Sequence, residues 1–184
     1  WQVPACDRCN QKYSRIEGEL LVRLGLCVDP QDARAAGIGE RAVRALTPRN
    51  GKGSLDKFMR KKKLRKLMKE IRPAAELPRS AKLPGFRFAP GAEELGMAVL
   101  APVDELKKMC EKLVRGLTYY HYGQYIKKDH VVKVWFLNES GEQWVIEMLN
   151  KVGKKHHREP GIEVTVGLAS DDAQSGLFCI DVWG

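Results

Sequence analysis

Two cysteines near the start of the chain, Cys6 and Cys9, have the spacing of a metal-binding pair. Thiolates separated by two residues can bind one zinc ion, because the intervening backbone turns and its amides support the sulfurs. A structural zinc ion takes four ligands, and this pair supplies two of them. The four histidines lie far downstream, at His121, His130, His156 and His157. Taken alone, the pair is also compatible with packing or with redox chemistry, although a redox motif requires a βαβ context that this sequence does not show.

The residues around this pair carry a family resemblance. The string Val-Pro-Ala-Cys-Asp-Arg-Cys-Asn at residues 3–10, with Ser14 and Glu17 on an expected helix, resembles the second half of the zinc-containing HNH endonuclease module. The resemblance implies a remnant of a ββα-metal zinc knuckle, in which Cys6 and Cys9 bind a structural Zn²⁺. It further implies that Asn10 helps to hold a catalytic divalent ion, Mg²⁺ or another. The activity implied is metal-assisted hydrolysis of a phosphodiester in DNA.

The same family pattern contains residues that would precede Trp1, namely an earlier Cys-x-x-Cys pair and a strand bearing the general-base histidine. Because that histidine prepares the attacking water, the chain is expected to be an inactive, N-terminally incomplete part of such a nuclease. Asn10 has an alternative role as an ordinary helix N-cap. Ser14 and Glu17 are expected to face solvent or to orient neighbours.

Positive charge is concentrated in one segment, residues 52–72. It holds ten basic and two acidic residues, a net charge of +8, whereas the whole chain has a net charge of +9. Lysine and arginine on backbone phosphates release condensed counterions and so favour nucleic-acid binding. The residues expected to bind nucleic acid, most simply DNA, are Lys57, Arg60, Lys61, Lys62, Lys63, Arg65, Lys66 and Lys69. The alternative is a solvated basic helix face without a ligand.

The basic segment is predicted to be a helix that begins with Ser54 as its N-cap and ends before Pro73. One apolar stripe on it consists of Leu55, Phe58 and Met59. A second stripe, almost opposite, consists of Leu64, Leu67, Met68 and Ile71. One straight helix does not bury opposite stripes against a single surface, so we expect a bend near residues 61–63 or a separate packing partner for each half.

The element pattern predicts an α+β protein with a mostly antiparallel sheet in its last part. Helices are expected at residues 10–27, 31–46, 54–72, 104–117 and 140–152. Strands are expected at residues 86–88, 97–100, 131–137, 162–166 and 177–182. Three segments follow: residues 1–29 as the C-terminal part of the HNH module, 30–81 as the helical basic segment with a linker, and 82–184 as a small α+β domain.

An aromatic run at residues 113–123 resembles a stretch of uncharacterised bacterial HNH-like proteins. This resemblance does not assign an activity to the run. Arg115, Tyr119 and His121 within it could line a pocket, but hydrogen-bonded structural roles are the favoured interpretation. His156 and His157 are expected in a solvated turn, where adjacent histidines point in different directions and do not share a metal ion.

The amino-acid composition indicates a globular protein without a membrane-spanning helix. Hydrophobic residues make up 43% and charged residues 30% of the 184 residues, which is typical of a globular protein. No apolar run approaches the roughly 20 residues of a membrane helix, so no membrane partner and a cytoplasmic location are expected. The odd, scattered cysteines do not form a secreted disulfide framework.

Three functions are therefore considered. The first is an HNH-type DNA endonuclease, and the second is a non-catalytic zinc-knuckle protein that binds nucleic acid through the basic helix. In the third, the cysteine pair is incidental to a basic α+β protein. The sequence assigns no oligomeric state.

Overall fold

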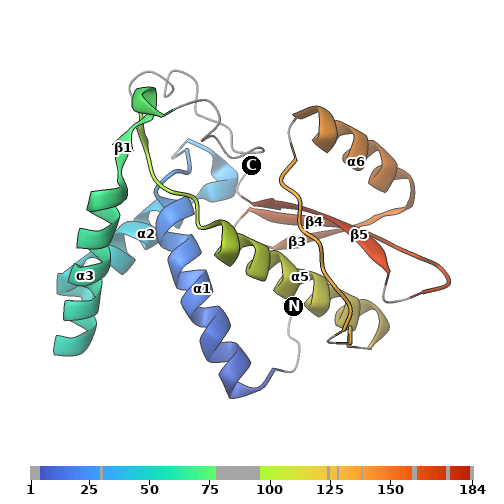
Figure 1. Cartoon of the computed structure of the whole chain (residues 1–184), viewed down its shortest axis with the longest axis horizontal. Coiled ribbons are helices and arrows are strands. Elements are labelled where there is room, and N and C mark those ends of the chain that lie inside the picture. Colours follow the sequence, from blue (N-terminus) through green and yellow to red (C-terminus); the bar gives the residue numbers. More distant parts are fainter. Residues whose placement is uncertain are drawn as a thin grey trace. The chain divides into compact units, whose positions relative to one another are not determined.

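The computed structural model describes residues 5–29, 31–77, 96–123, 125–127, 129–137, 139–158, 161–172 and 175–182 (Figure 1). The chain divides into two compact units. Unit 1 comprises residues 1–16 and 103–184, and unit 2 comprises residues 17–102. The class is α+β, as predicted. None of the helices in the described part of the chain combines the length and the apolar character that crossing a bilayer requires.

Unit 2 is mainly helical. Helix α1 spans Asp7–Gly25 and gives its C-terminal part to this unit, followed by a 3₁₀ turn at Ala33–Ala35 and by α2 at Ile38–Leu46. A second 3₁₀ turn at Pro48–Asn50 leads to α3, Ser54–Glu70. A short antiparallel pair joins β1, Arg72–Pro73, to β2, Met97–Ala98, and a 3₁₀ turn at Ala74–Glu76 follows β1.

The core of unit 2 lies between α1, α2 and α3. Val22, Leu46 and Leu67, one from each helix, are buried together. Beside them Arg23 is only 6% exposed, and its guanidinium contacts Glu19 at 2.7 Å and Glu70 at 2.5 Å. The two carboxylates compensate the buried charge, which would otherwise be costly.

The expected helix at residues 31–46 is interrupted. Gly37 adopts a left-handed conformation with φ of 76° and precedes α2, so the α-helix begins only at Ile38. The left-handed conformation is sterically unfavourable for residues that carry a Cβ atom, and glycine has none. The α-helix is therefore shorter than the periodicity suggested.

Two expectations about the basic helix are wrong. Gly53 occupies the N-cap position, and Ser54 is the first helical residue. Helix α3 is continuous, and only its second apolar stripe is buried, through Leu67, with Leu64 and Ile71 half-buried beside it. Neither a bend nor a second packing partner among the described residues accommodates the first stripe, which is exposed.

Unit 1 contains a three-stranded antiparallel sheet between two helices (Figure 1). The helices are α5, Val103–Tyr122, and α6, Glu139–Val152. The strands are β3, Lys154–Arg158, β4, Ile162–Leu168, and β5, Gly176–Val182, in the order β3-β4-β5. The expected strands at 162–166 and 177–182 are confirmed.

Each helix covers one face of this sheet. Leu117 of α5 packs against Val164 and Val166 of β4. On the opposite face, a Cβ built on Gly167 would lie 2.7 Å from Leu149 Cδ2, so the glycine lets α6 approach β4 closely.

The predicted strand at residues 131–137 is wrong. These residues are extended and alternate in burial, but they form no ladder with any strand that the structure describes. Alternation reports a half-buried extended segment, and it does not report whether a hydrogen-bonding partner is present. The predicted strand at 86–88 lies outside the described residues.

Candidate nucleic-acid interface and cysteine pair

The eight basic residues predicted to bind nucleic acid all lie on α3, but their side chains divide into two groups. Arg60 and Lys63 are half-buried. The exposed group consists of Lys57, Lys61, Lys62, Arg65, Lys66 and Lys69. The sequence did not distinguish the groups, because the distinction depends on which helix face packs against α1 and α2.

Arg60 and Lys63 make contacts inside unit 2. Arg60 donates from Nε to Asp56 Oδ1 at 2.9 Å and from Nη1 to the backbone oxygen of Arg44 at 2.8 Å. Lys63 donates from Nζ to the backbone oxygen of Gly18 at 2.7 Å and lies 3.1 Å from Glu19 Oε2. These two cations hold α3 against α2 and α1 and contribute little to a ligand surface.

The exposed group is mostly available for an anionic ligand. Lys66 is 69% exposed and lies 3.9 Å from Glu70 Oε1, at the outer limit of an ion pair, so this contact contributes little. Within the described ranges, none of the other five has a carboxylate partner. From Lys57 to Lys69 the helix rises about 18 Å, a length that corresponds to about five phosphates along one DNA strand.

The same solvent-facing side of α3 carries the first apolar stripe. Leu55, Phe58 and Met59 are 73%, 61% and 53% exposed. At 100° per residue, Lys62 and Lys66 continue this side of the helix toward its C-terminus. A pocket of about 530 Å³ opens beside it, lined by Ala45, Asp56, Met59, Arg60, Lys62, Lys63 and Lys66. The exposed face of α3 therefore combines an apolar half with a cationic half.

The cysteine pair lies at the start of α1. Cys6 immediately precedes the helix, Cys9 is in its first turn, and both thiols are exposed and free. The backbone amide of Asn10 donates to the backbone oxygen of Cys6 at 3.0 Å, so Asn10 is inside the first turn. The alternative role of Asn10 as the N-cap is therefore wrong.

The two thiols differ in acidity. Hydrogen bonds from the backbone and the side chain of Cys9 lower the pKa of the Cys6 thiol below its ordinary value of 9.0. The hydrogen bond to Cys6 and the negative charge on that sulfur raise the pKa of Cys9. A zinc ion binds thiolates, so Cys6 is already biased toward the ligand form.

This donor set fits half of a structural zinc site. Two exposed thiols within one turn match two thiolate positions, and Asn10 lies on the same turn. Among the residues that the structure places, no group of three or more His, Cys, Asp or Glu side chains is positioned to hold a metal ion. The other ligands of a zinc ion bound here would have to come from outside those residues.

Arg115, Tyr119 and His121 each contact a different group in unit 1. Arg115 donates to the backbone oxygens of Ile126 at 3.1 Å and His130 at 3.2 Å, which ties the segment after α5 to the helix. Tyr119 stacks on Tyr125, with ring centroids 4.5 Å apart. All three residues therefore make structural contacts, as expected, and His121 does so through a hydrogen bond to His156, a pairing that the sequence did not indicate.

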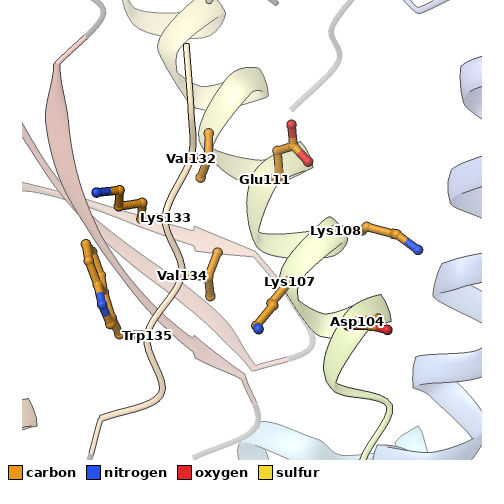
Figure 2. Close-up of a pocket in the computed structure, with 8 residues that line it drawn as sticks. All are labelled: Asp104, Lys107, Lys108, Glu111, Val132, Lys133, Val134 and Trp135. Carbon is orange, nitrogen blue, oxygen red and sulfur yellow. The ribbon is translucent and has the colours of Figure 1, made fainter. Parts of the chain in front are cut away.

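A second pocket, of about 620 Å³, lies in unit 1 between α5 and the extended segment 132–135. Figure 2 shows Val132 and Val134 on the side toward α5, with Lys133 and Trp135 on the other side of the segment. Its lining residues are Asp104, Lys107, Lys108, Glu111, Val132, Lys133, Val134 and Trp135. Three lysines against two carboxylates leave only a small positive excess, so α3 presents the stronger anion-binding surface.

Comparison with known proteins yields no relative. The chain matches no protein-family model, and no curated protein or solved structure is significantly similar to it.

Proposed function

We propose that this chain is part of an HNH-type, metal-dependent nuclease in which the exposed face of α3 binds the phosphate backbone of DNA. The observation that carries the DNA-binding part is the division of the α3 cations: two make internal contacts, and six are exposed along one helix. Contacts of lysine and arginine side chains with DNA phosphates position the nucleic acid without reading its base sequence.

The hydrolytic part of the proposal rests on the resemblance at residues 3–10. Cys6 and Cys9 would provide two thiolate ligands to a structural zinc ion, and Asn10 would help to hold the catalytic divalent ion. That ion would stabilise charge on the scissile phosphate and the leaving oxygen. The exposure of both thiols and the lowered pKa of Cys6 support zinc binding.

A salt titration tests the DNA-binding surface. We expect the triple variant Lys62→Gln, Arg65→Gln, Lys66→Gln to bind a DNA duplex more weakly and with a smaller dependence on salt. Each phosphate contact contributes about −0.9 to the slope of log K against log salt concentration, so losing three lowers its magnitude by about two to three. Fluorescence anisotropy at several salt concentrations measures this slope.

The matched control removes three exposed positive charges outside α3, through Arg41→Gln, Arg49→Gln and Lys151→Gln. Its net charge equals that of the α3 variant, so a general charge effect would change both slopes equally. If the two triple variants show the same slope, the exposed face of α3 is not the DNA-binding surface. Lys63 is unsuitable for this test, because its substitution would also remove contacts with Gly18 and Glu19.

The second candidate is the non-catalytic nucleic-acid-binding protein. It is favoured by the fact that the α3 surface needs no metal ion for binding. Plasmid nicking with Mg²⁺ or Mn²⁺ discriminates between the candidates. The assay uses a form of the protein that carries the upstream histidine strand of the family pattern. Cleavage that is lost in Asn10→Ala would support the nuclease, whereas DNA binding without cleavage would support the binder.

A further inference from the structure

His121 and His156 converge from two elements of unit 1. His121 lies in the last turn of α5, and His156 lies in the middle of β3. Their Nε2 atoms are 2.8 Å apart, and the rings are nearly perpendicular, with an interplanar angle of 79°. The register places His156 opposite Val164 of β4, and the same sheet face receives Leu117, one helical turn before His121. The packing of α5 on the sheet therefore fixes the separation of the two imidazoles.

The surroundings favour neutral rings. Burial, the neighbouring His156 and Lys154 lower the pKa of His121, and burial and Lys154 lower the pKa of His156. Tyr120 lies with its ring edge-on to both imidazoles, at centroid distances of 5.9 and 6.2 Å. Neutral imidazole is the form that binds metal ions.

Two neutral imidazoles at this distance can share one hydrogen bond, but their separation also fits a pair of metal ligands. Two nitrogens bound at about 2.0 Å and 90° apart are about 2.8 Å from each other, whereas a tetrahedral ion holds them about 3.3 Å apart. The observed separation thus matches neighbouring positions of a tetragonal or octahedral ion. Within the described sheet β3 is an edge strand, so no strand covers its outer side.

We propose that His121 and His156 form a binding site for a divalent transition-metal ion of the imidazole-preferring class, represented by Ni²⁺ or Cu²⁺, with water in the remaining positions. Tetragonal and octahedral nitrogen coordination is typical of these ions. The site is separate from Cys6, Cys9 and α3, and it does not depend on the proposed nuclease function.

The test uses the full chain with Cys6→Ser and Cys9→Ser, so that the exposed thiols do not compete for the metal. Calorimetric titration with Ni²⁺ is expected to give one ion per chain. Replacing either His121 or His156 by Ala is expected to weaken this binding roughly tenfold or more. The control is His157→Ala, which removes the adjacent, 63% exposed imidazole of the same strand and is expected to leave the affinity unchanged.

A second measurement covers the case in which an alanine variant does not fold. In the Cys6→Ser, Cys9→Ser chain with all four histidines in place, Ni²⁺ should protect His121 and His156 from diethyl pyrocarbonate while His130 and His157 continue to react, as read by peptide mass spectrometry. The proposal is overturned if Ni²⁺ does not bind the double-serine chain, or if protection is equal at all four histidines. Loss of affinity in His157→Ala equal to that in His156→Ala would also overturn it.

Discussion

At the residue scale, the two cysteines are chemically unequal although they share one turn. Cys6 accepts hydrogen bonds from the backbone and the side chain of Cys9, and these stabilise its thiolate. The negative charge of that thiolate disfavours deprotonation of the Cys9 thiol. The pair therefore deprotonates in two steps that belong to both residues. A metal ion would remove this inequality by binding both thiolates.

This inequality predicts an order of alkylation. Because the pKa of Cys6 is lowered, its thiolate forms at a lower pH than an ordinary cysteine thiolate does, and Cys9 needs a higher pH than usual. As the pH rises from about 6 to about 9, iodoacetamide should modify Cys6 before Cys9 in the metal-free chain. Peptide mass spectrometry at low extents of reaction measures both rates.

Cys9→Ala serves as the control for this order. The substitution removes the side-chain donor to Cys6 and keeps the backbone amide of residue 9, so the alkylation of Cys6 should shift toward higher pH while the pKa of Cys6 stays below that of an ordinary cysteine. Faster reaction at Cys9 than at Cys6 in the unsubstituted chain would contradict the assigned hydrogen bonds.

At the element scale, α3 bears two apolar stripes with different roles. Leu67 is 3% exposed and packs with Val22 and Leu46, whereas Leu55 is 73% exposed. The helix is held on its packed side by apolar contacts and by the hydrogen bonds of Arg60 and Lys63. Its other side is free to serve a ligand.

Matched leucine substitutions test this asymmetry. Leu67→Ala should lower the free energy of unfolding by about 2–5 kcal/mol, because it removes buried methyl groups and leaves a cavity. Leu55→Ala should change it by no more than about 0.5 kcal/mol, as expected for an exposed position. Urea denaturation followed by circular dichroism measures both. Comparable losses for the two variants would show that the first stripe is covered.

At the scale of the whole molecule, each unit has its own core. Leu117, Val164 and Val166 form the core of unit 1, and Val22, Leu46 and Leu67 form that of unit 2. Unit 2 is inserted in the chain between residue 16 and residue 103, so unit 1 is built from two separate segments. Local stability can therefore differ between the units.

Hydrogen exchange tests this independence. Leu117→Ala should reduce the protection of amides in β4 and β5 while α3 keeps its protection, because Leu117 is 1% exposed and contacts Val164 and Val166. Leu67→Ala should have the reverse pattern. Equal loss of protection in both units, in either variant, would show that they unfold as one cooperative unit.

Much of the element pattern follows from the sequence. Helical periodicity located α1, α3, α5 and α6, and alternation located the neighbouring strands β4 and β5. The concentration of positive charge on α3 is likewise a property of the sequence alone. These features depend on neighbours three or four residues away in a helix, or two in a strand, so a linear pattern reports them.

The tertiary structure decided the features that depend on distant partners. Arg60 and Lys63 became internal contacts because the backbone oxygens of Arg44 and Gly18 lie beside them, and no local pattern separates them from Lys62. Residues 131–137 have the alternation of a strand but no ladder among the described strands. His121 meets His156 across 35 positions only because α5 packs on the sheet. Periodicity reports which sides of an element are apolar, whereas tertiary packing decides which of those sides is buried and which group lies opposite a given side chain.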